Sequence, residues 1–371
     1  MSSPNLAPAW NAFGLRLLRH WAQTEPAKNL VFSPASVLAA LLMAWSGARQ
    51  QTAAELGAVL GLGMMDSETA LTAGAALLRL SQTEPQVTLH SANGLWTAAD
   101  LMPEFVARCQ HSLGAGLERM GEPSETAERI NAWVSEQTRG KIGDLLQAAD
   151  LAGALLVLVN ALYFKGQWQR PFDPQSTVPG NFHPLDGEPQ PVSFMQRKGR
   201  ISVLENDHCQ AVALPYGSGR FRMELFLPRQ GSPANVFEQP LPVFAARSVQ
   251  LRLPRFALES RLDLIPALQA SGIASAFGED ADFSGMATGG LFIHRALHKA
   301  RLEVNEQGSE AAAATALAMP RGARPAKTLE LTFDRPFACL LRDTSSDLVL
   351  FQALIRSEEH TSELQSPNTN S

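Results

Sequence analysis

Residues 303–337 read EVNEQGSEAAAATALAMPRGARPAKTLELTFDRPF, and the interpretation of the whole chain starts from this stretch. Loops in compact proteins rarely reach about 20 residues, and they favour polar turn-forming residues. The segment that follows Gly308 instead consists of small residues, with no glycine, proline or bulky side chain from Ser309 to Ala316. An ordinary surface loop is therefore a poor description of it.

Two secondary structures fit this segment. A run of alanines has high helix propensity, so the segment taken alone favours a surface helix. As a strand it could enter a sheet without burying a charge, because its only charged residue, Glu310, lies at its start. Gly308 supplies the backbone freedom that a hinge needs. With the period of two that a strand requires, one face carries Ser309, Ala311, Ala313, Thr315, Leu317 and Met319.

The composition of the chain excludes several classes of function. The 371 residues include 31 Lys and Arg against 36 Asp and Glu, so a net charge of −5 provides no basic surface for nucleic acid. The longest apolar stretch, residues 151–164, is interrupted by Asn160 and is too short to span a bilayer. It is better suited to a buried strand, and we expect no membrane association. The first 21 residues lack a basic leader followed by an apolar core, so no secretory signal is predicted.

No catalytic or metal-binding motif is present. Cys109, Cys209 and Cys339 lie far apart without a CxxC pair, which argues against both a disulfide framework and a zinc site. The chain contains no GxSxG, HExxH, P-loop or GxGxxG pattern. His294 and His298 are four residues apart but have no acidic residue between them, so we assign them structural roles. We therefore predict that the protein is not an enzyme and has no cofactor or metal.

The chain divides into a helix-rich first part and a strand-rich second part, which indicates an α+β fold. An amphipathic helix is expected over residues 9–21, and a helix over 35–45 follows a serine cap and a proline. A later helical pattern covers residues 125–146, within which Gly140 is placed where a helix would stop. From residue 155 onward, β-rich runs such as FRMELFLP and LELTFDRPF dominate, and a short helix is expected over 262–271.

The last residues of the chain differ in origin from the rest. No linker or internal repeat interrupts residues 1–355, which we interpret as a single interwoven domain. Residues 356–366, RSEEHTSELQS, match the in-frame translation of a widely used sequencing adapter. We therefore interpret residues 356–371 as a non-native tail and leave them out of the fold.

The stretch over residues 303–337 resembles the hinge and reactive-centre loop of the serpins. The resemblance covers residues 9–355, with its motifs in family order: NLVFSPASV, INAWVSEQTRGKIGDLL, LVNALYFKGQWQRPFDP, VALPYGSGRFRMELFLP, LRLPRFALES, ADFSGM and LHKARLEVNEQGSEAAAAT. It implies three β-sheets, about nine helices and an exposed reactive loop at about residues 306–328. It also implies a serine protease inhibitor that is cut in the loop, traps the protease as a covalent acyl-enzyme and inserts the loop into its main sheet.

The resemblance also implies three groups of functional residues. A shutter cluster holds the central strands until they part, and a breach region marks where insertion begins. We expect Arg255 and Glu306 of the breach to pair and to restrain early opening. The full sets are the hinge Glu306, Gly308, Ser309, Glu310, Ala311, Ala312, Ala313, Ala314 and Thr315; the shutter Ser33, Ser36, Asn160 and His298; and the breach Trp168, Arg255 and Glu306.

The scissile bond follows from the length of the loop. Counting the usual loop length of the family from Glu306 places it after Gly322, before Ala323. A loop shorter by one residue places it between Arg321 and Gly322, which suits a trypsin-like pocket with an acidic base and is the site we predict. If elastase-like enzymes are the targets, Ala318 or Met319 would be read instead.

The same residues bear on the alternative functions, the binding partners and the location of the protein. A non-inhibitory serpin acting as a carrier or chaperone is the main alternative, and the small hinge residues argue against it; a hydrolase is a distant third. Between residues 69 and 118, Arg79 and Arg108 are the only basic residues besides histidines, so no heparin-like polyanion site is expected. We expect a monomer whose partner is a serine protease. The family resemblance favours an extracellular or periplasmic location, with a cytoplasmic one left open.

Overall fold

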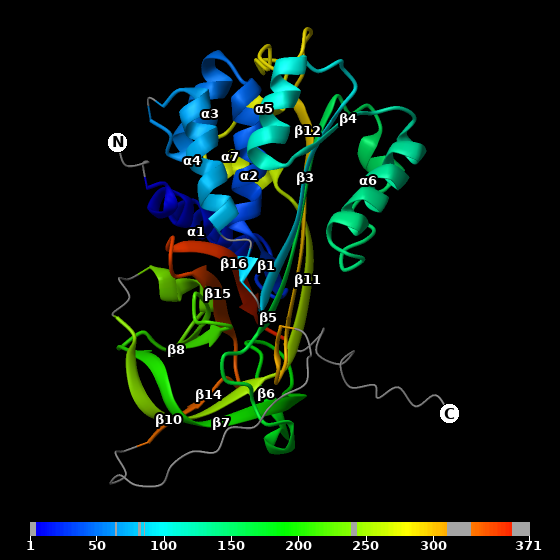
Figure 1. Ribbon diagram of the computed structural model, residues 1–371. Helices are drawn as coiled ribbons and strands as arrows, with labels where there is room; N and C mark the ends of the chain where they lie inside the picture. The colour runs from blue at the N-terminus through cyan, green and yellow to red at the C-terminus, as the bar shows by residue number, and fades with distance from the viewer. Residues whose placement is uncertain are drawn as a thin grey trace.

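The computed structural model describes residues 5–357 except 64, 81, 82, 85, 239–242 and 310–327. Most helices of this described part gather on one side of the molecule, over two large sheets (Figure 1). The α-helices are α1 (Ala7–Thr24), α2 (Pro34–Gly47), α3 (Gln50–Leu60), α4 (Ser67–Leu80), α5 (Pro103–Leu113), α6 (Pro123–Gln137) and α7 (Ile265–Ala270). Short 3-10 helices are η1 (Ala148–Leu151), η2 (Pro174–Ser176), η3 (Pro233–Phe237) and η4 (Ser275–Phe277).

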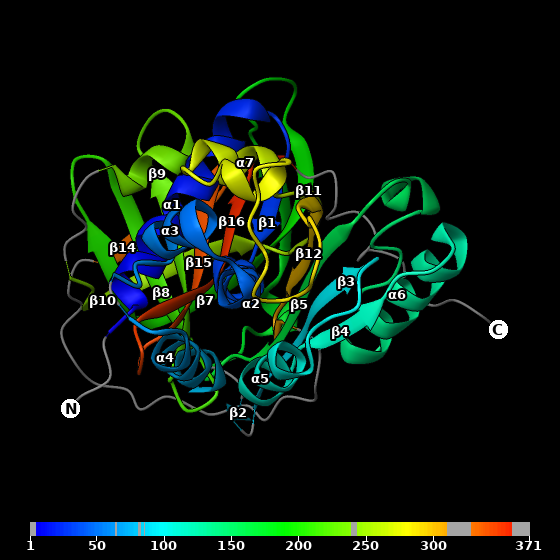
Figure 2. The same ribbon diagram turned by 90° about the horizontal axis from the view of Figure 1, so that it is seen from above.

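A seven-stranded sheet forms the long axis of the molecule. Its main order is β11-β12-β5-β3-β2, with β13 paired to β5 and β4 paired to β3. Helix α6 lies on one face of this sheet and the other helices lie on the opposite side (Figure 2). The strands are β2 (Thr83–Glu84), β3 (Val87–Thr97), β4 (Gly116–Arg119), β5 (Leu156–Gln167), β11 (Phe256–Asp263), β12 (Ile293–Val304) and β13 (Gly308–Ser309).

A nine-stranded sheet forms the other half of the core. Its order is β1-β16-β15-β9-β8-β7-β10-β14, with β6 paired to β7. Its strands are β1 (Leu30–Phe32), β6 (Val178–Phe182), β7 (Gln190–Glu205), β8 (Cys209–Tyr216), β9 (Phe221–Pro228), β10 (Ala245–Pro254), β14 (Leu329–Thr332), β15 (Phe337–Asp343) and β16 (Leu348–Ile355).

The α+β class is confirmed, although the described residues form two hydrogen-bonded sheets and seven α-helices where the resemblance implied three sheets and about nine helices. The long strand β7 explains the difference in sheets. Its last residues pair with β8, while Phe194–Val203 pairs with β10, so one strand joins two expected sheets into a continuous ladder.

Helix α2 begins as its sequence predicts. The hydroxyl of Ser33 accepts a hydrogen bond from the backbone N–H of Ser36 at 3.1 Å, and Pro34 occupies the first helical position. This cap satisfies a backbone donor that would otherwise have no partner. Nearly every residue of α2 is buried, so the helix runs through the centre of the molecule and fixes the position of its capping serine.

Helix α6 ends close to the stop predicted at Gly140 and does not extend over the whole helical pattern of residues 125–146. It ends at Gln137, because Arg139 and Gly140 both adopt a left-handed backbone and the N–H of Gly140 bonds to the carbonyl of Ser135 at 2.7 Å. The apolar residues beyond it, Ile142 among them, turn back and pack under the helix. Helix α7 is also shorter than predicted, since β11 continues to Asp263.

Cys109, Cys209 and Cys339 are buried and free. No helix of the described residues is long and apolar enough to cross a bilayer. Of the tail interpreted as non-native, Arg356 and Ser357 are described; Arg356 is buried, and its Nε and Nη2 have no hydrogen-bond partner among the described residues.

Candidate functional site: a parallel seam and its hinge

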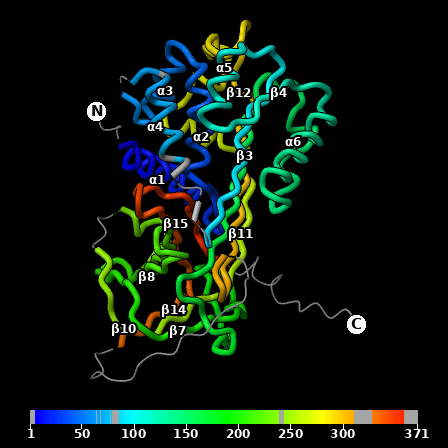
Figure 3. Tube along the Cα trace, viewed as in Figure 1, coloured from blue at the N-terminus to red at the C-terminus, as the bar shows by residue number. Residues whose placement is uncertain are grey.

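The centre of the seven-stranded sheet is a parallel pair. Residues Leu156–Tyr163 of β5 pair with Ile293–Arg301 of β12, and antiparallel strands flank this pair on both sides. We call this pairing the seam; the traces of its strands run side by side in Figure 3. Parallel pairing is slightly less stable per residue than antiparallel pairing. The seam is therefore a weak line in the middle of an otherwise stable sheet.

The hinge returns the chain to the end of this seam. After β12 ends at Val304, Asn305 and Gly308 exchange backbone hydrogen bonds of 2.8 and 3.2 Å, which close a tight turn. Strand β13 then pairs antiparallel with Gln167 and Gly166 of β5. Strand β13 thus lies along the same edge of β5 as β12, beyond the end of the seam. A chain continuing in this direction would enter the seam antiparallel to both of its strands.

Gly308 is required by this geometry. Its φ of 142° is a backbone conformation that residues with a side chain rarely adopt. A Cβ at this position would lie 2.0 Å from the carbonyl oxygen of Gly166, far inside van der Waals contact. The predicted hinge glycine is therefore the residue that allows β13 to lie against β5.

Ser309 shows which face of the hinge is buried. The residue is 1% exposed, and its hydroxyl lies 2.9 Å from the hydroxyl of Tyr216. Burial raises the pKa of Tyr216 well above its ordinary value, so this phenol stays protonated. The ring of Tyr216 stacks on Trp168, with centroids 4.1 Å apart. Residues at every second position after Ser309 would share this inward face if the strand continued.

The breach residues are brought together around Glu306. Arg255 Nη2 lies 2.6 Å from Glu306 Oε1, and Arg255 Nε donates to both carboxylate oxygens. The indole N–H of Trp168 donates to the carbonyl of Asn305 at 2.9 Å. Thr177, which sequence reasoning missed, donates its hydroxyl to Glu306 at 2.5 Å. The carboxylate is almost fully buried, so its bonds anchor the turn before the hinge.

The four predicted shutter residues form a connected network under the seam. The N–H of Ser33 donates to His298 Nε2 at 3.0 Å, and His298 Nδ1 bonds to Asn160 Oδ1 at 2.5 Å. Asn160 Nδ2 donates to the carbonyl of Ser36 at 2.8 Å. Asn160 and His298 are register partners across the seam. The network therefore ties both strands of the seam to the start of α2.

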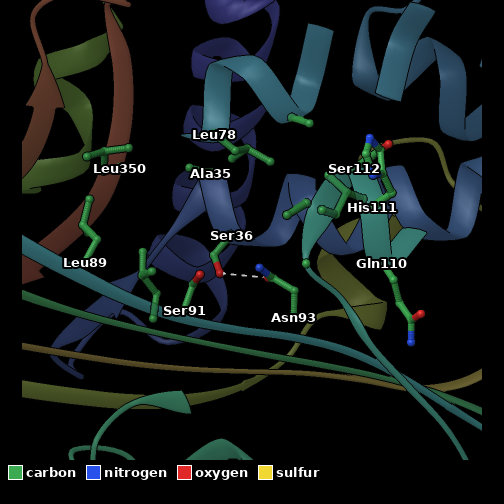
Figure 4. Close-up of a pocket in the computed structure, with 15 residues that line it drawn as sticks. Ala35, Ser36, Leu78, Leu89, Ser91, Asn93, Gln110, His111, Ser112 and Leu350 are labelled. Carbon is green, nitrogen blue, oxygen red and sulfur yellow. Dashed lines mark hydrogen bonds between the residues drawn. The ribbon is translucent and has the colours of Figure 1, made fainter. Parts of the chain in front are cut away.

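Sequence reasoning missed a fifth member, Asn93 of β3. Its Oδ1 accepts from Ser36 Oγ at 3.4 Å (Figure 4) and from Asn160 Nδ2. Asn93, Asn160 and His298 are successive register partners on three adjacent strands. The available signal was an amide in the middle of the β-rich run VTLHSANGLWT, where a polar residue needs a partner.

The network fixes the charge of His298. Burial lowers the pKa of His298 to about 3, so the imidazole is neutral. The hydrogen bonds require the same state, because Nε2 accepts from the N–H of Ser33 and must carry no proton. His298 thus takes part in the network as a neutral hydrogen-bonding side chain. His294 lies on the same strand, and the described residues contain no group of three or more His, Cys, Asp or Glu that could hold a metal.

Helix α6 and the segment after it bridge the outer face of the seam. Trp133 of α6 lies against Gly94 and Gly116, on the β3 and β4 side. The segment after the helix is held on the other side, where Lys299 Nζ donates to the carbonyl of Gly143 at 2.9 Å. Arg261 Nη2 adds an ion pair to Asp150 at 2.6 Å. Separation of the two strands would therefore require this segment to shift.

The remaining predicted site residues lie outside the described part of the chain. These are the reactive bond residues Arg321 and Gly322 and the hinge residues Glu310, Ala311, Ala312, Ala313, Ala314 and Thr315. Their roles stay predictions. The described hinge, shutter and breach residues form two clusters, one beneath the seam and one at the end where the chain turns back.

Comparisons with known proteins agree with this architecture. A family model described as Serpin (serine protease inhibitor) matches residues 8–357. "Iris" of Ixodes ricinus is 35% identical over 355 residues, covering 90% of this chain and 93% of that protein. The leukocyte elastase inhibitor of Bos taurus is 33% identical over 374 residues, covering 93% and 97%. The crystal structure of Serpin48, a highly specific serpin of Tenebrio molitor, superposes with a TM-score of 0.86 at 29% identity, covering 96% and 99%.

Proposed function

Because this chain belongs to the serpin family, we propose that it inhibits serine proteases as a suicide substrate. The observation that supports this most directly is the hinge, where β13 already pairs with β5 at the end of the parallel seam. The residues that follow are small enough to continue between β5 and β12. One relative, the leukocyte elastase inhibitor, is named for inhibiting a protease.

The proposed reaction begins as ordinary proteolysis. The serine oxygen of the protease bonds to the carbonyl carbon of Arg321, the Arg321–Gly322 peptide bond breaks, and the amine of Gly322 leaves with a proton. The protease is then held as an ester on Arg321. Insertion of the cut segment into the seam carries the protease to the other end of the sheet and distorts its active site, so that water does not complete the hydrolysis.

Strand pairing supplies the driving force for insertion. Residues 309–321 as a strand would extend about 40 Å at ~3.3 Å per residue. Insertion replaces one parallel ladder with two antiparallel ladders, and each new backbone hydrogen bond contributes a net ~1 kcal/mol. The gain, before the entropy of ordering is subtracted, exceeds roughly 10 kcal/mol. The uncut protein would then be metastable and protected by a kinetic barrier.

We propose trypsin-like targets, because Arg321 offers the side chain that an acidic specificity pocket binds. Cleavage at Gly322–Ala323 is the second candidate bond, and elastase-like targets would instead read Ala318 or Met319. We further propose that residues 1–355 act as one monomeric inhibitor domain with no polyanion cofactor, and that residues 356–371 are a non-native tail.

Mixing the protein with trypsin tests the function and the bond together. We expect a complex that survives boiling in detergent, and a released C-terminal peptide whose mass begins at Gly322. Arg321→Ala should abolish the complex with trypsin, whereas Arg324→Ala should retain it. Complete cleavage of the wild type by trypsin, elastase-like and other serine proteases with no stable complex would overturn inhibition. That outcome would favour the carrier or chaperone alternative, which otherwise lacks a specific observation in its support.

A further inference from the structure

Three positively charged side chains share one exposed face of the nine-stranded sheet. Strands β7 and β10 pair antiparallel, so residues that oppose each other in the register point to the same face. Buried Val249 and Leu251 of β10 mark the inner face. The register pairs on the outer face are Arg200–Ser248, Lys198–Gln250 and Gln196–Arg252. Lys198 and Arg200 are exposed and Arg252 is half-buried, and we call these three residues the basic face.

The charge of the basic face is not balanced by its surroundings. None of its three cations forms an ion pair within the described ranges, whereas Arg229 and Arg247 both pair with Glu205 at the end of β7. The neighbouring strand β14 adds one acidic residue to this face, Glu330, in register with Gln250. Positive charge therefore exceeds negative charge here, although the net charge of the whole chain is −5. A local excess of this kind attracts a partner of opposite charge.

Arg252 is held in place by its neighbours. Its guanidinium lies over the ring of Phe194, with Cζ 5.0 Å from the ring centroid. Gly180 of β6 leaves room beside it, since a Cβ at that position would lie 3.4 Å from Nη2 of Arg252. An arginine that is already ordered loses less side-chain entropy when a partner binds, and arginines are frequent among the residues that dominate interface energies. Arg252 thus offers a fixed charge beside two exposed ones.

The basic face lies next to the place where the reactive loop rejoins the sheet. Thr328 Oγ1 is 3.3 Å from the hydroxyl of Ser248, the register partner of Arg200. Arg321, the predicted site of cleavage, precedes Thr328 by seven residues, which span no more than about 25 Å. Strands β7, β10 and β14 lie together at one end of the molecule, away from α3 and α5 (Figure 1). A protease of about 220 residues is roughly 40 Å across, so with Arg321 in its active site it comes within reach of the basic face.

We propose that the basic face is a second contact for the protease and selects, among enzymes that cleave after arginine, those with an acidic surface beside the active site. The inference rests on the inhibitory function proposed above and deepens it. Arg321 suits every trypsin-like pocket, so it does not distinguish enzymes that share this pocket. Charges outside the pocket do distinguish them, because complementary surfaces raise the rate of association and like charges lower it.

Two trypsins of opposite net charge, one anionic and one cationic, test this selection. At about 0.05 M salt, Lys198→Glu/Arg200→Glu should lower the second-order rate constant of loop cleavage by anionic trypsin about tenfold and raise that of cationic trypsin. Lys198→Gln/Arg200→Gln should have an intermediate effect on both rate constants. At about 0.5 M salt the effects should shrink to less than about threefold, since the screening length falls to a few ångströms.

The matched control makes the same change in net charge elsewhere on the surface. Lys28→Glu/Arg119→Glu replaces two side chains that are 74% and 66% exposed. Lys28 precedes β1, at the opposite edge of the nine-stranded sheet from β14, and Arg119 ends β4 of the seven-stranded sheet. This variant should leave both rate constants within about twofold of the wild type, because distant exposed charges are largely screened.

The outcomes separate this proposal from the proposed function, because cleavage is measured apart from trapping. The basic face is refuted if the reversed variant changes neither rate constant, if it changes both in the same direction, or if the control matches its effect. Charge-dependent cleavage without a stable complex would support the basic face and refute inhibition. A stable complex formed at the same rate by every variant would support inhibition and refute the basic face.

Discussion

Gly308 lies so close to β5 that its missing side chain determines whether the hinge can form. The neighbouring residue, Ser309, contributes the opposite property, a side chain that fits the interior and bonds to Tyr216. One residue permits the close approach and the next fixes the inward face. Single substitutions at this turn should therefore have large effects on the native state.

Gly308→Ala should lower the free energy of unfolding by about 3 kcal/mol, because it combines an unfavourable φ with a collision against the carbonyl of Gly166. Urea-induced unfolding followed by fluorescence measures the change. Gly278→Ala is the matched control, since its added Cβ meets no atom within 4 Å and its φ of −140° suits any residue. Equal stability of Gly308→Ala and the wild type would contradict the hinge geometry.

His298 should make the native state sensitive to acid. Its pKa is about 3 in the folded chain and near 6.5 when unfolded, so the unfolded state binds an extra proton between these values. The free energy of unfolding should fall as the pH falls, by about 2 kcal/mol between pH 7 and pH 5 from this residue. His298→Gln should show a correspondingly smaller loss in urea titrations at the two pH values. Parallel profiles for the two proteins would refute the assignment.

The register of β13 on β5 predicts where each residue of the hinge segment would lie in the seam. If the antiparallel register of β13 continues along β5, Ala313 faces Leu162 on the inner side and Ala312 faces Tyr163 on the outer side. The outer position lies near Lys141, whose ammonium is 5.7 Å from the ring of Tyr163. A carboxylate would therefore be unpaired on the inner face, whereas on the outer face it would lie near an ammonium group.

Ala313→Glu should convert the inhibitor into a substrate that trypsin cleaves without a stable complex, because insertion would bury an unpaired carboxylate. Ala312→Glu is the matched variant and should retain most of the complex, since its carboxylate would lie beside Lys141. The fraction of complex on a denaturing gel measures both. Undiminished trapping by Ala313→Glu would be incompatible with insertion in this register.

At the scale of the whole molecule, the proposal requires energy stored in the uncut fold. The shutter, the Arg255–Glu306 pair and the bridge formed by α6 all act on the same seam from different sides. His298 and Asn160 of the shutter join β12 to β5, the Arg255–Glu306 pair holds the turn after β12, and the segment after α6 bonds to β12. Under the proposed function, the better-paired sheet is reached only when the loop is cut. The proposed function therefore requires the stability of the uncut protein to be partly kinetic.

Cleavage in the loop should raise the Tm of the wild type by about 20 °C or more, as expected from a gain above roughly 10 kcal/mol. Calorimetry before and after limited trypsin treatment measures the shift. Cleaved Ala313→Glu should show little or no rise, which separates insertion from the loss of a chain connection. An unchanged Tm of the cleaved wild type would rule out the stored energy.

Local patterns in the sequence determined much of this protein. The cap and proline before α2, the β-rich runs after residue 155, the hinge glycine with its small residues, and the family motifs were all recognisable, because each depends on neighbours within a few positions. The same local reasoning placed a helix stop at Gly140, where the structure has one, but carried the helical pattern past it to residue 146. The positive-φ stop at Arg139 and Gly140 competes with an apolar pattern that continues because Ile142 packs beneath the helix.

Contacts between residues far apart in the chain depend on how the segments pack in three dimensions. Asn93 joins the shutter because strand register places it opposite Asn160, and Thr177 joins Glu306 across 129 positions of sequence. The joining of two expected sheets through β7 has the same origin. Local sequence sets the conformation of each segment, whereas register and packing depend on the sum of many weak contacts between segments far apart in the chain.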